Sequence, residues 1–248
     1  FGTNSYRKPP FSPGTKMDGT LFTGTNSHLN NISGSGSYNF SHTVTNNGVP
    51  RPDIQVLYHV PEGFDKQSMK IMMVFHGGYR NANDYRDYWI PQANYKGFAV
   101  FAPQFAGAGY PGSSNYHTGG VFDSLPDASD DEADLYISDY NEENEWTFTI
   151  VEELFQDIKF KLKSTQTKAW AWGHSAGSQF LHRFILYKGS EIFEKAGCAN
   201  AGWYTFPSKE HPSWFSLPGT PTSGTDTNDY FHFPYGLDYS NDTTTTLD

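Results

Sequence analysis

The chain has very little cysteine, no long hydrophobic run and few basic residues. Its 248 residues include one cysteine, Cys198, so an intrachain disulfide is excluded and cysteine usage does not fix the redox compartment. No apolar stretch approaches the roughly 20 residues that a transmembrane helix needs, so we expect no transmembrane segment. Lys and Arg number 17 against 27 Asp and Glu, a net charge of −10. This charge argues against a nucleic-acid partner, because phosphate binding needs clustered basic residues.

Sequence patterns for metal and phosphate binding are also missing. No Cys/His set has zinc-ligand spacing, and no G-x-x-x-x-G-K-[ST] loop occurs. Residues 123–145 hold ten acidic side chains and no Lys or Arg. Carboxylates of this kind suit calcium, but the D-x-D-x-D-G spacing of an EF-hand loop is absent. We therefore predict a solvated acidic insertion, and neither a metal nor a cofactor.

The chain is long enough to bury one sizeable core. Residues 1–50 are polar and rich in Gly, Ser, Thr and Asn, which predicts an extended N-terminal arm with one or two edge strands near 37–45. Residues 51–248 are interpreted as the folded domain, incomplete at its C-terminal end.

Hydrophobic patterning from residue 53 onward alternates between strands and helices. Pro91 interrupts the first helix, Pro103 is expected to end the third strand, and Thr149-Ile-Val-Glu152 has the spacing of a capping box. The alternation predicts a mostly parallel sheet with helices on both faces. Strands are expected at 53–60, 70–75, 97–102, 168–172 and 195–201, and helices at 81–96, 149–163 and 176–187.

One motif carries a reaction chemistry. Gly173-His174-Ser175-Ala176-Gly177 lies between an expected strand and an expected helix, as a G-x-S-x-G nucleophile elbow does. A serine at such a turn takes a strained backbone conformation, and small neighbours let strand and helix approach. With 24 Gly in the chain the bare pattern arises easily by chance, so its place between strand and helix gives it weight. We predict that Ser175 is a nucleophile.

A second loop is positioned to complete an oxyanion hole. The buried strand 70–75 runs into His76-Gly77-Gly78, where hydrolases of this architecture place an oxyanion donor. The expected donors are the N–H of Ala176 and the N–H of Gly78 or Tyr79. We interpret His76 as a brace of its loop and not as the general base.

Five segments in order make the sequence resemble a known family: FHGGYRNANDYRDYW (75–89), FAVFAPQF (98–105), WAWGHSAGSQFLHRF (170–184), ANAGWYTFP (199–207) and FPYGL (233–237). They resemble secreted bacterial-type α/β hydrolases related to polyhydroxybutyrate depolymerases and feruloyl esterases. The resemblance spans roughly residues 53–237 and implies an α/β-hydrolase fold. It also implies ester hydrolysis through an acyl-Ser175, a donor loop at 77–79, and Tyr79 and Trp203 at the substrate.

The sequence departs from that family in its C-terminal part. The family places its acid and then its histidine after two further strands, but only 46 residues follow Gly202 and none has a strand pattern. We expect the last strands to be missing from this chain, which leaves the acid and base of the triad unassigned. Asp229 and His232 are the candidates within the tail, and His182 is assigned to packing or surface.

Three explanations stay open for the missing part: a second polypeptide that carries it, a fragment, or a hydrolase-derived structural protein. The predicted function is hydrolysis of carboxylic esters, whether small, polymeric or linked to the plant cell wall. The alternative is a non-catalytic hydrolase-fold protein used for binding or as a subunit of a homo-assembly. A third hypothesis is a polymer-binding module that uses exposed aromatic residues, namely Tyr110, Tyr116, Trp203, Tyr204, Trp214 and Phe215.

Two features of the sequence favour a secreted glycoprotein. The chain opens on Phe1 rather than Met, as if a leader had been removed. N-glycosylation sequons begin at Asn31, Asn39 and Asn241. We therefore expect an extracellular protein.

Overall fold

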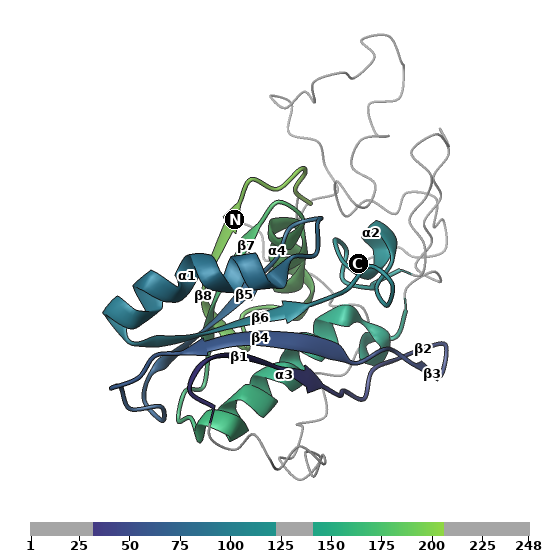
Figure 1. The fold of residues 1–248 in the computed structure, drawn as a ribbon. Helices are drawn as coiled ribbons and strands as arrows, with labels where there is room; N and C mark the ends of the chain where they lie inside the picture. Colours follow the sequence, from purple (N-terminus) through teal and green to yellow (C-terminus); the bar gives the residue numbers. More distant parts are fainter. Residues whose placement is uncertain (1–31, 123–140, 206–248) are drawn as a thin grey trace, which may run out of the picture.

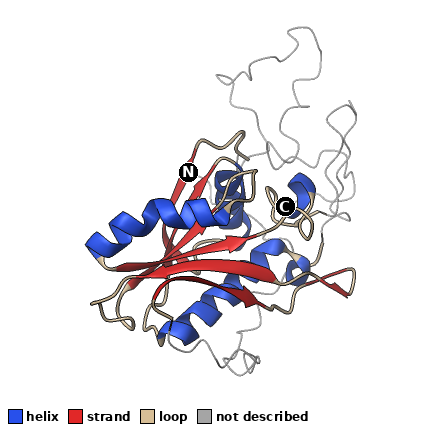
Figure 2. Cartoon of the chain, in the orientation of Figure 1, coloured by secondary structure: helices blue, strands red, loops and turns tan. Residues whose placement is uncertain are grey.

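A computed structural model describes residues 32–122 and 141–205 of the chain (Figure 1). Their main feature is a six-stranded sheet in the order β1-β4-β6-β5-β7-β8. Strands β6, β5, β7 and β8 are parallel, while β4 and β1 add to the β6 edge in antiparallel fashion. Helices cover both faces of the sheet (Figure 2), so the predicted class, a mostly parallel α/β sheet, is confirmed.

The strand and helix order from residue 53 matches the prediction. The strands are β1 (Gly34–Phe40), β2 (Thr45–Asn46), β3 (Val49–Pro50), β4 (Ile54–Val60), β5 (Lys70–Phe75), β6 (Phe98–Gln104), β7 (Ala169–His174) and β8 (Phe193–Ala199). The helices are α1 (Ala82–Lys96), α2 (Gly112–Asn115), the 3-10 turn η3 (Glu143–Glu145), α3 (Thr147–Leu162) and α4 (Ala176–Lys188). The small hairpin of β2 and β3 stands apart from the main sheet.

The central strand β5 is buried on both faces, which is why its sequence is a continuous apolar run. Met73 and Phe75 point into the larger core, which α3 and α4 cover. Met72 and Val74 point into the smaller core beneath α1. Alternate side chains of one strand therefore contribute to two cores. Helices α1 and α3 lie on opposite sides of the sheet (Figure 1), and α4 packs into the same core as α3.

The N-terminal segment joins the sheet. Strand β1 pairs along its whole length with β4, which confirms the expected edge strand. Tyr38 and Phe40 of β1 are buried in the larger core, and Tyr38 Oη donates a hydrogen bond to Asp157 Oδ2 of α3 at 2.9 Å. From Ile32 onward the segment thus packs as part of the domain, and the boundary expected at residue 50 falls inside the packed structure.

Three local expectations were wrong. Helix α1 runs from Ala82 to Lys96 with Pro91 inside it, so the proline does not interrupt the helix. Strand β6 continues through Pro103, which pairs with Val56 of β4. Pairing of β6 with β5 ends at Phe101, so the missing N–H of Pro103 costs no bond on that side. The capping box is absent as well: Trp146 is the N-cap of α3, and Thr149 lies inside the helix with its hydroxyl donating to the Glu143 carbonyl at 2.5 Å.

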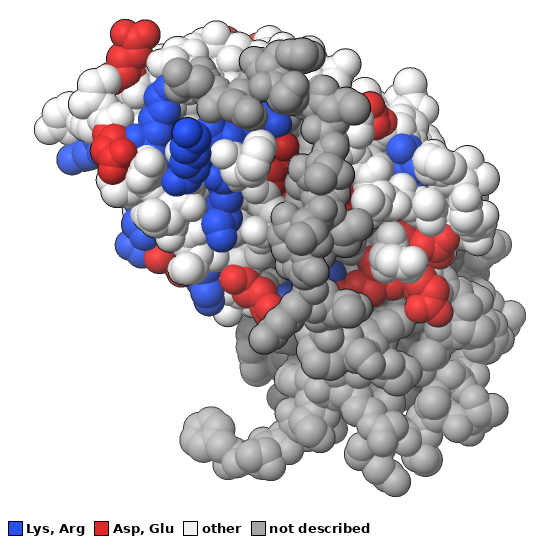
Figure 3. All heavy atoms as spheres, turned by 90° about the horizontal axis from the view of Figure 1, so that it is seen from below, with Lys and Arg blue, Asp and Glu red and all other residues white. Residues whose placement is uncertain are grey.

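The described residues carry 13 Lys and Arg and 13 Asp and Glu, so the net charge of −10 comes entirely from residues outside the described ranges. Seen from below, basic side chains gather in one region of the surface (Figure 3). Within residues 32–122 and 141–205, no helix is long and apolar enough to cross a membrane.

Candidate active site

Four parallel strands end at the same edge of the sheet, and the candidate site lies there. Each strand delivers a loop at its carboxyl end, where open α/β sheets bind their ligands. His76 follows β5, Phe105 follows β6, Ser175 follows β7 and Asn200 follows β8. The loop after β5 and the loop after β7 therefore lie at the same edge, as expected for a nucleophile and its oxyanion donors.

Ser175 has the strained backbone expected of it. Its φ of 55° and ψ of −121° lie in a region of backbone conformation that residues other than glycine rarely adopt. The Ser175 N–H donates to the Ala199 carbonyl of β8 at 3.0 Å, and the Ser175 carbonyl accepts from the N–H groups of Ser178 and Gln179, both at 3.0 Å. These bonds hold a tight turn between β7 and α4.

Close packing explains the two glycines of the motif. A Cβ on Gly173 would lie 2.3 Å from the Gly177 carbonyl oxygen, and a Cβ on Gly177 would lie 2.1 Å from the Phe75 carbonyl oxygen. Both obstacles are main chain and cannot rotate away. We call residues 173–177 the Ser175 turn.

The Gly77 loop, residues 76–80, lies directly beside this turn. A Cβ placed on Gly77 would be 3.7 Å from Ser175 Cβ. The loop is a tight turn in which the Arg80 N–H donates to the Gly77 carbonyl at 3.1 Å, and Gly78 is exposed within it. Ala176 is the first residue of α4, so its N–H has no acceptor within the helix. The structure thus brings the two loops that carry the predicted donors together.

His76 braces the Gly77 loop, as interpreted from the sequence. Its Nδ1 bonds to the Gly77 carbonyl at 2.9 Å, and its Nε2 accepts from the Phe105 N–H at 3.1 Å. The Tyr116 hydroxyl donates to the His76 carbonyl at 2.7 Å, and the two rings stack. Burial lowers the pKa of His76 to about 4, so the ring is neutral at physiological pH and both of its nitrogens are occupied.

Arg80 supports the same loop and was not singled out by its sequence context. Its guanidinium donates to the carbonyls of Phe105 at 2.7 Å and Gly112 at 3.2 Å, and it lies 4.4 Å from the centre of the Tyr116 ring. These contacts join the loops after β5 and β6. No local sequence pattern announces them, because the partners are 25 and 32 residues away.

The aromatic residues that were expected at the surface or the substrate have different environments. The Tyr79 side chain is 97% exposed, so a substrate contact there remains a prediction. Trp203 packs near the Arg183 guanidinium, 5.6 Å away, and the His117 ring. Tyr110 and Tyr116 are buried, which corrects their assignment to an exposed aromatic surface, whereas Tyr204 is 41% exposed.

No histidine lies within hydrogen-bonding distance of Ser175 Oγ among residues 32–122 and 141–205. His182 is engaged on both sides: its Nδ1 bonds to the Ser178 carbonyl at 2.8 Å, and its Nε2 accepts from the Thr205 N–H at 3.0 Å. Its assignment to packing is therefore confirmed, and burial lowers its pKa to about 4. Asp229 and His232 lie outside the described residues, as does the acidic stretch from 123 to 140.

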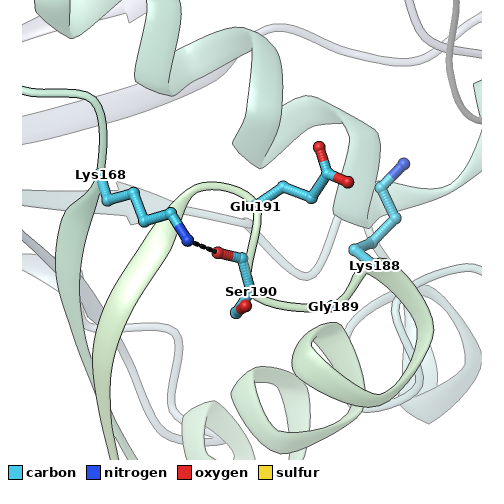
Figure 4. Close-up of a pocket in the computed structure, with 5 residues that line it drawn as sticks. All are labelled: Lys168, Lys188, Gly189, Ser190 and Glu191. Carbon is cyan, nitrogen blue, oxygen red and sulfur yellow. Dashed lines mark hydrogen bonds between the residues drawn. The ribbon is translucent and has the colours of Figure 1, made fainter.

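A hollow elsewhere on the surface is not part of this site. It is lined by Lys168, Lys188, Gly189, Ser190 and Glu191 (Figure 4). Lys188 ends α4, whereas Ser175 precedes the first residue of that helix. Lys168 Nζ donates to the Ser190 carbonyl at 2.8 Å. The buried Lys188 ammonium pairs with Glu143 and, at 2.6 Å, with Glu152. Glu143 and Glu152 thus form a buried ion cluster with Lys188 beside this hollow.

Two solved structures are similar to this chain in both sequence and fold. Poly(aspartic acid) hydrolase-1 from Sphingomonas sp. KT-1 is 30% identical with a TM-score of 0.59, over 77% of this chain and 65% of its own. LpqC, a poly(3-hydroxybutyrate) depolymerase from Bordetella parapertussis, is 26% identical with a TM-score of 0.60, over 75% of this chain and 58% of its own. The chain has the α/β-hydrolase fold and is similar in sequence and structure to a poly(aspartic acid) hydrolase and a poly(3-hydroxybutyrate) depolymerase.

This α/β hydrolase spans less than two thirds of the length of both solved relatives. No family model and no curated protein matches it. The resemblance stated from five sequence segments is nevertheless confirmed at the level of the family and the fold.

Proposed function

We propose that this protein is a serine hydrolase that cleaves carboxylic esters through an acyl-Ser175 intermediate. The observation that carries the proposal is the conformation of Ser175, whose φ of 55° and ψ of −121° set it at a tight turn against the N-terminus of α4. Such strain persists only where the surrounding structure enforces it, and it concentrates at active sites. Here the glycines at 77, 173 and 177 stand where a Cβ would meet neighbouring atoms at less than 3.0 Å, so the close packing around the serine depends on them.

In the proposed reaction Ser175 Oγ attacks the ester carbonyl carbon and its proton passes to a histidine base. The carbonyl oxygen becomes an oxyanion, which the N–H groups of Ala176 and Gly78 stabilise at the positive end of the α4 dipole. The alcohol leaves with the proton, and water then releases the acid from Ser175. The base and its carboxylate are assigned to residues outside the described ranges, where Asp229 and His232 are the candidates in this chain, or to a second polypeptide.

The substrate class is proposed from the two relatives. By their names they act on poly(aspartic acid), which is a polyamide, and on poly(3-hydroxybutyrate), which is a polyester. The polyester-degrading relative makes polyesters and their soluble oligomers the first substrates to test, beside p-nitrophenyl butyrate, and poly(aspartic acid) tests whether amide bonds are cleaved as well. We also propose that the protein works outside the cell, which the sequons at Asn31, Asn39 and Asn241 support.

The test is labelling with a fluorophosphonate, followed by intact and peptide mass spectrometry. We expect labelling at Ser175, loss of that label in Ser175→Ala, and parallel loss of p-nitrophenyl butyrate hydrolysis. Ser113→Ala, on the short helix α2, is a matched control that should label normally. An unlabelled wild-type protein would refute the proposal and favour the alternative, a hydrolase fold retained for binding or assembly.

A further inference from the structure

Backbone strain in the described chain gathers at the carboxyl edge of the sheet. Five residues other than glycine have positive φ, and three of them follow parallel strands: Arg80 at 58°, Ser175 at 55° and Asn200 at 50°. Asparagine tolerates this region better than most residues. Ser175 is the proposed nucleophile and Arg80 supports the Gly77 loop. Asn200 has neither role, so its conformation needs another reason.

Asn200 reaches back to the Ser175 turn. Its Nδ2 lies 3.3 Å from His174 Nε2, and His174 Nδ1 lies 3.2 Å from the Tyr85 hydroxyl oxygen. An amide nitrogen can only donate, so with the Asn200 amide oriented this way His174 Nε2 is an acceptor. The neutral ring then carries its proton on Nδ1 and donates it to Tyr85. The three side chains form one directed chain of hydrogen bonds from Asn200 through His174 to Tyr85.

Tyr85 brings this chain to the Gly77 loop. It lies in the first turn of α1, is 9% exposed, and packs beside the His174 and Trp172 rings. A Cβ on Gly77 would lie 2.7 Å from the Tyr85 hydroxyl oxygen and 3.7 Å from Ser175 Cβ, so those two atoms are at most about 6.4 Å apart. Burial raises the pKa of Tyr85, and a hydrogen bond with the Gly77 backbone acts in the opposite direction. The hydroxyl therefore lies against the Gly77 loop and close to the Ser175 turn.

We propose that Asn200, His174 and Tyr85 are positioning residues that fix the Gly77 loop relative to the Ser175 turn. The inference rests on the proposed function, because it concerns the alignment of the oxyanion donors of that reaction. Donors must lie within about 2.7–3.1 Å of the developing oxyanion, and an error of about 1 Å can cost on the order of a hundredfold in rate. These hydrogen-bonded side chains connect three loops at this edge of the sheet, those after β5, β7 and β8. Both ring nitrogens of His174 are occupied by hydrogen bonds with Tyr85 and Asn200, so His174 is not the general base.

A plain packing role for Tyr85 makes a different prediction. Phenylalanine would keep the ring contacts with Trp172 and His174, so packing alone predicts a Tyr85→Phe protein with normal turnover. The positioning role predicts that turnover falls while substrate binding does not.

The experiment compares an ester with its thionoester in Tyr85→Phe. The substrates are p-nitrophenyl butyrate and its thiono analogue, in which sulfur replaces the carbonyl oxygen. Because sulfur accepts hydrogen bonds weakly, hydrolysis of the thionoester depends little on the alignment of the oxyanion donors. We expect kcat for the ester to fall about tenfold, as for a modest misplacement of donors, with KM unchanged. The ratio of ester to thionoester rates should fall with it. Tyr88→Phe, three residues along α1 with its side chain 73% exposed, is the matched control and should be unchanged.

A second variant tests whether the chain acts as a unit. His174→Gln should lower kcat as Tyr85→Phe does, and the double variant should be no worse than the poorer single variant, because members of one network are not additive. A normal kcat and rate ratio in Tyr85→Phe would overturn the inference, as would an equal loss on both substrates with a lowered melting temperature. A wild-type protein that fluorophosphonate does not label would overturn the proposed function as well; labelled wild type with unimpaired Tyr85→Phe overturns the positioning role alone.

Discussion

Replacing Gly177 by alanine should destabilise the protein even though it puts a better helix former into α4. The new Cβ would lie 2.1 Å from the Phe75 carbonyl oxygen, 2.6 Å from its carbon and 2.7 Å from the His76 carbonyl oxygen. Real Cβ contacts hardly ever fall below 3.0 Å, so β5 and α4 must separate by nearly an ångström. Both elements are buried at this point, and the atoms in the way belong to main chain.

Two effects oppose each other in this variant. Alanine in place of glycine favours a helix by about 1 kcal/mol, and it does so at the start of α4. Overpacking a rigid core costs about 1–3 kcal/mol, and obstruction by main chain belongs at the upper end. The net loss is therefore about 2 kcal/mol, which for a domain of this size lowers the melting temperature by roughly 4–8 °C.

The assay is thermal and urea unfolding of Gly177→Ala beside Gly78→Ala. Gly78 is the matched control, because a Cβ there would meet nothing within 4 Å and its φ is not positive. We expect the control to lie within about 0.5 kcal/mol of wild type. A Gly177→Ala protein as stable as this control would refute the packing argument for the Ser175 turn.

Three further results are expected. Ser175→Gly should be more stable than Ser175→Ala by about 1–2 kcal/mol in urea unfolding, because glycine relieves the positive φ. Lys188→Met should lose about 3–5 kcal/mol by leaving two carboxylates unpaired, and adding Glu152→Gln should recover part of this. The pKa of His76 is lowered to about 4 in the folded protein, so between pH 6.5 and 4 the unfolded chain binds more protons than the folded one. The free energy of unfolding should therefore decrease as the pH is lowered from 6.5 to 4, by up to about 3 kcal/mol from this residue. Urea unfolding at a series of pH values measures this, and His76→Gln should weaken the dependence.

The elements that the sequence predicts well are those whose signal is local. The run Lys70–Phe75 gives β5 at its observed bounds because a strand buried on both faces needs an apolar residue at every position. Gly173 and Gly177 locate the Ser175 turn because only glycine fits the main-chain approach there. In both cases the constraint shows in the residue types themselves, although the main chain that excludes a Cβ at Gly177 belongs to Phe75 and His76.

What the sequence could not supply depends on distant partners. Tyr85 and His174 are 89 positions apart, and nothing near either residue says that they meet. Thr149 and Glu152 have the spacing of a capping box, but Glu152 pairs with Lys188, and the helix starts two residues earlier at Thr147. Tertiary contacts overrode a local motif there. The burial of Tyr38 and Phe40, which makes β1 part of the domain, likewise depends on distant partners.

The bond from the Ser175 N–H to the Ala199 carbonyl makes the serine dependent on the outermost described strand. Strand β8 pairs only with β7 among the described residues, and edges of this kind open by local unfolding at a lower free energy than the whole domain. Fraying of β8 would release the Ser175 N–H and Asn200 together. Activity should then disappear at lower urea concentration than the circular dichroism of the sheet, and the Ser175 amide should exchange with solvent faster than those of β5.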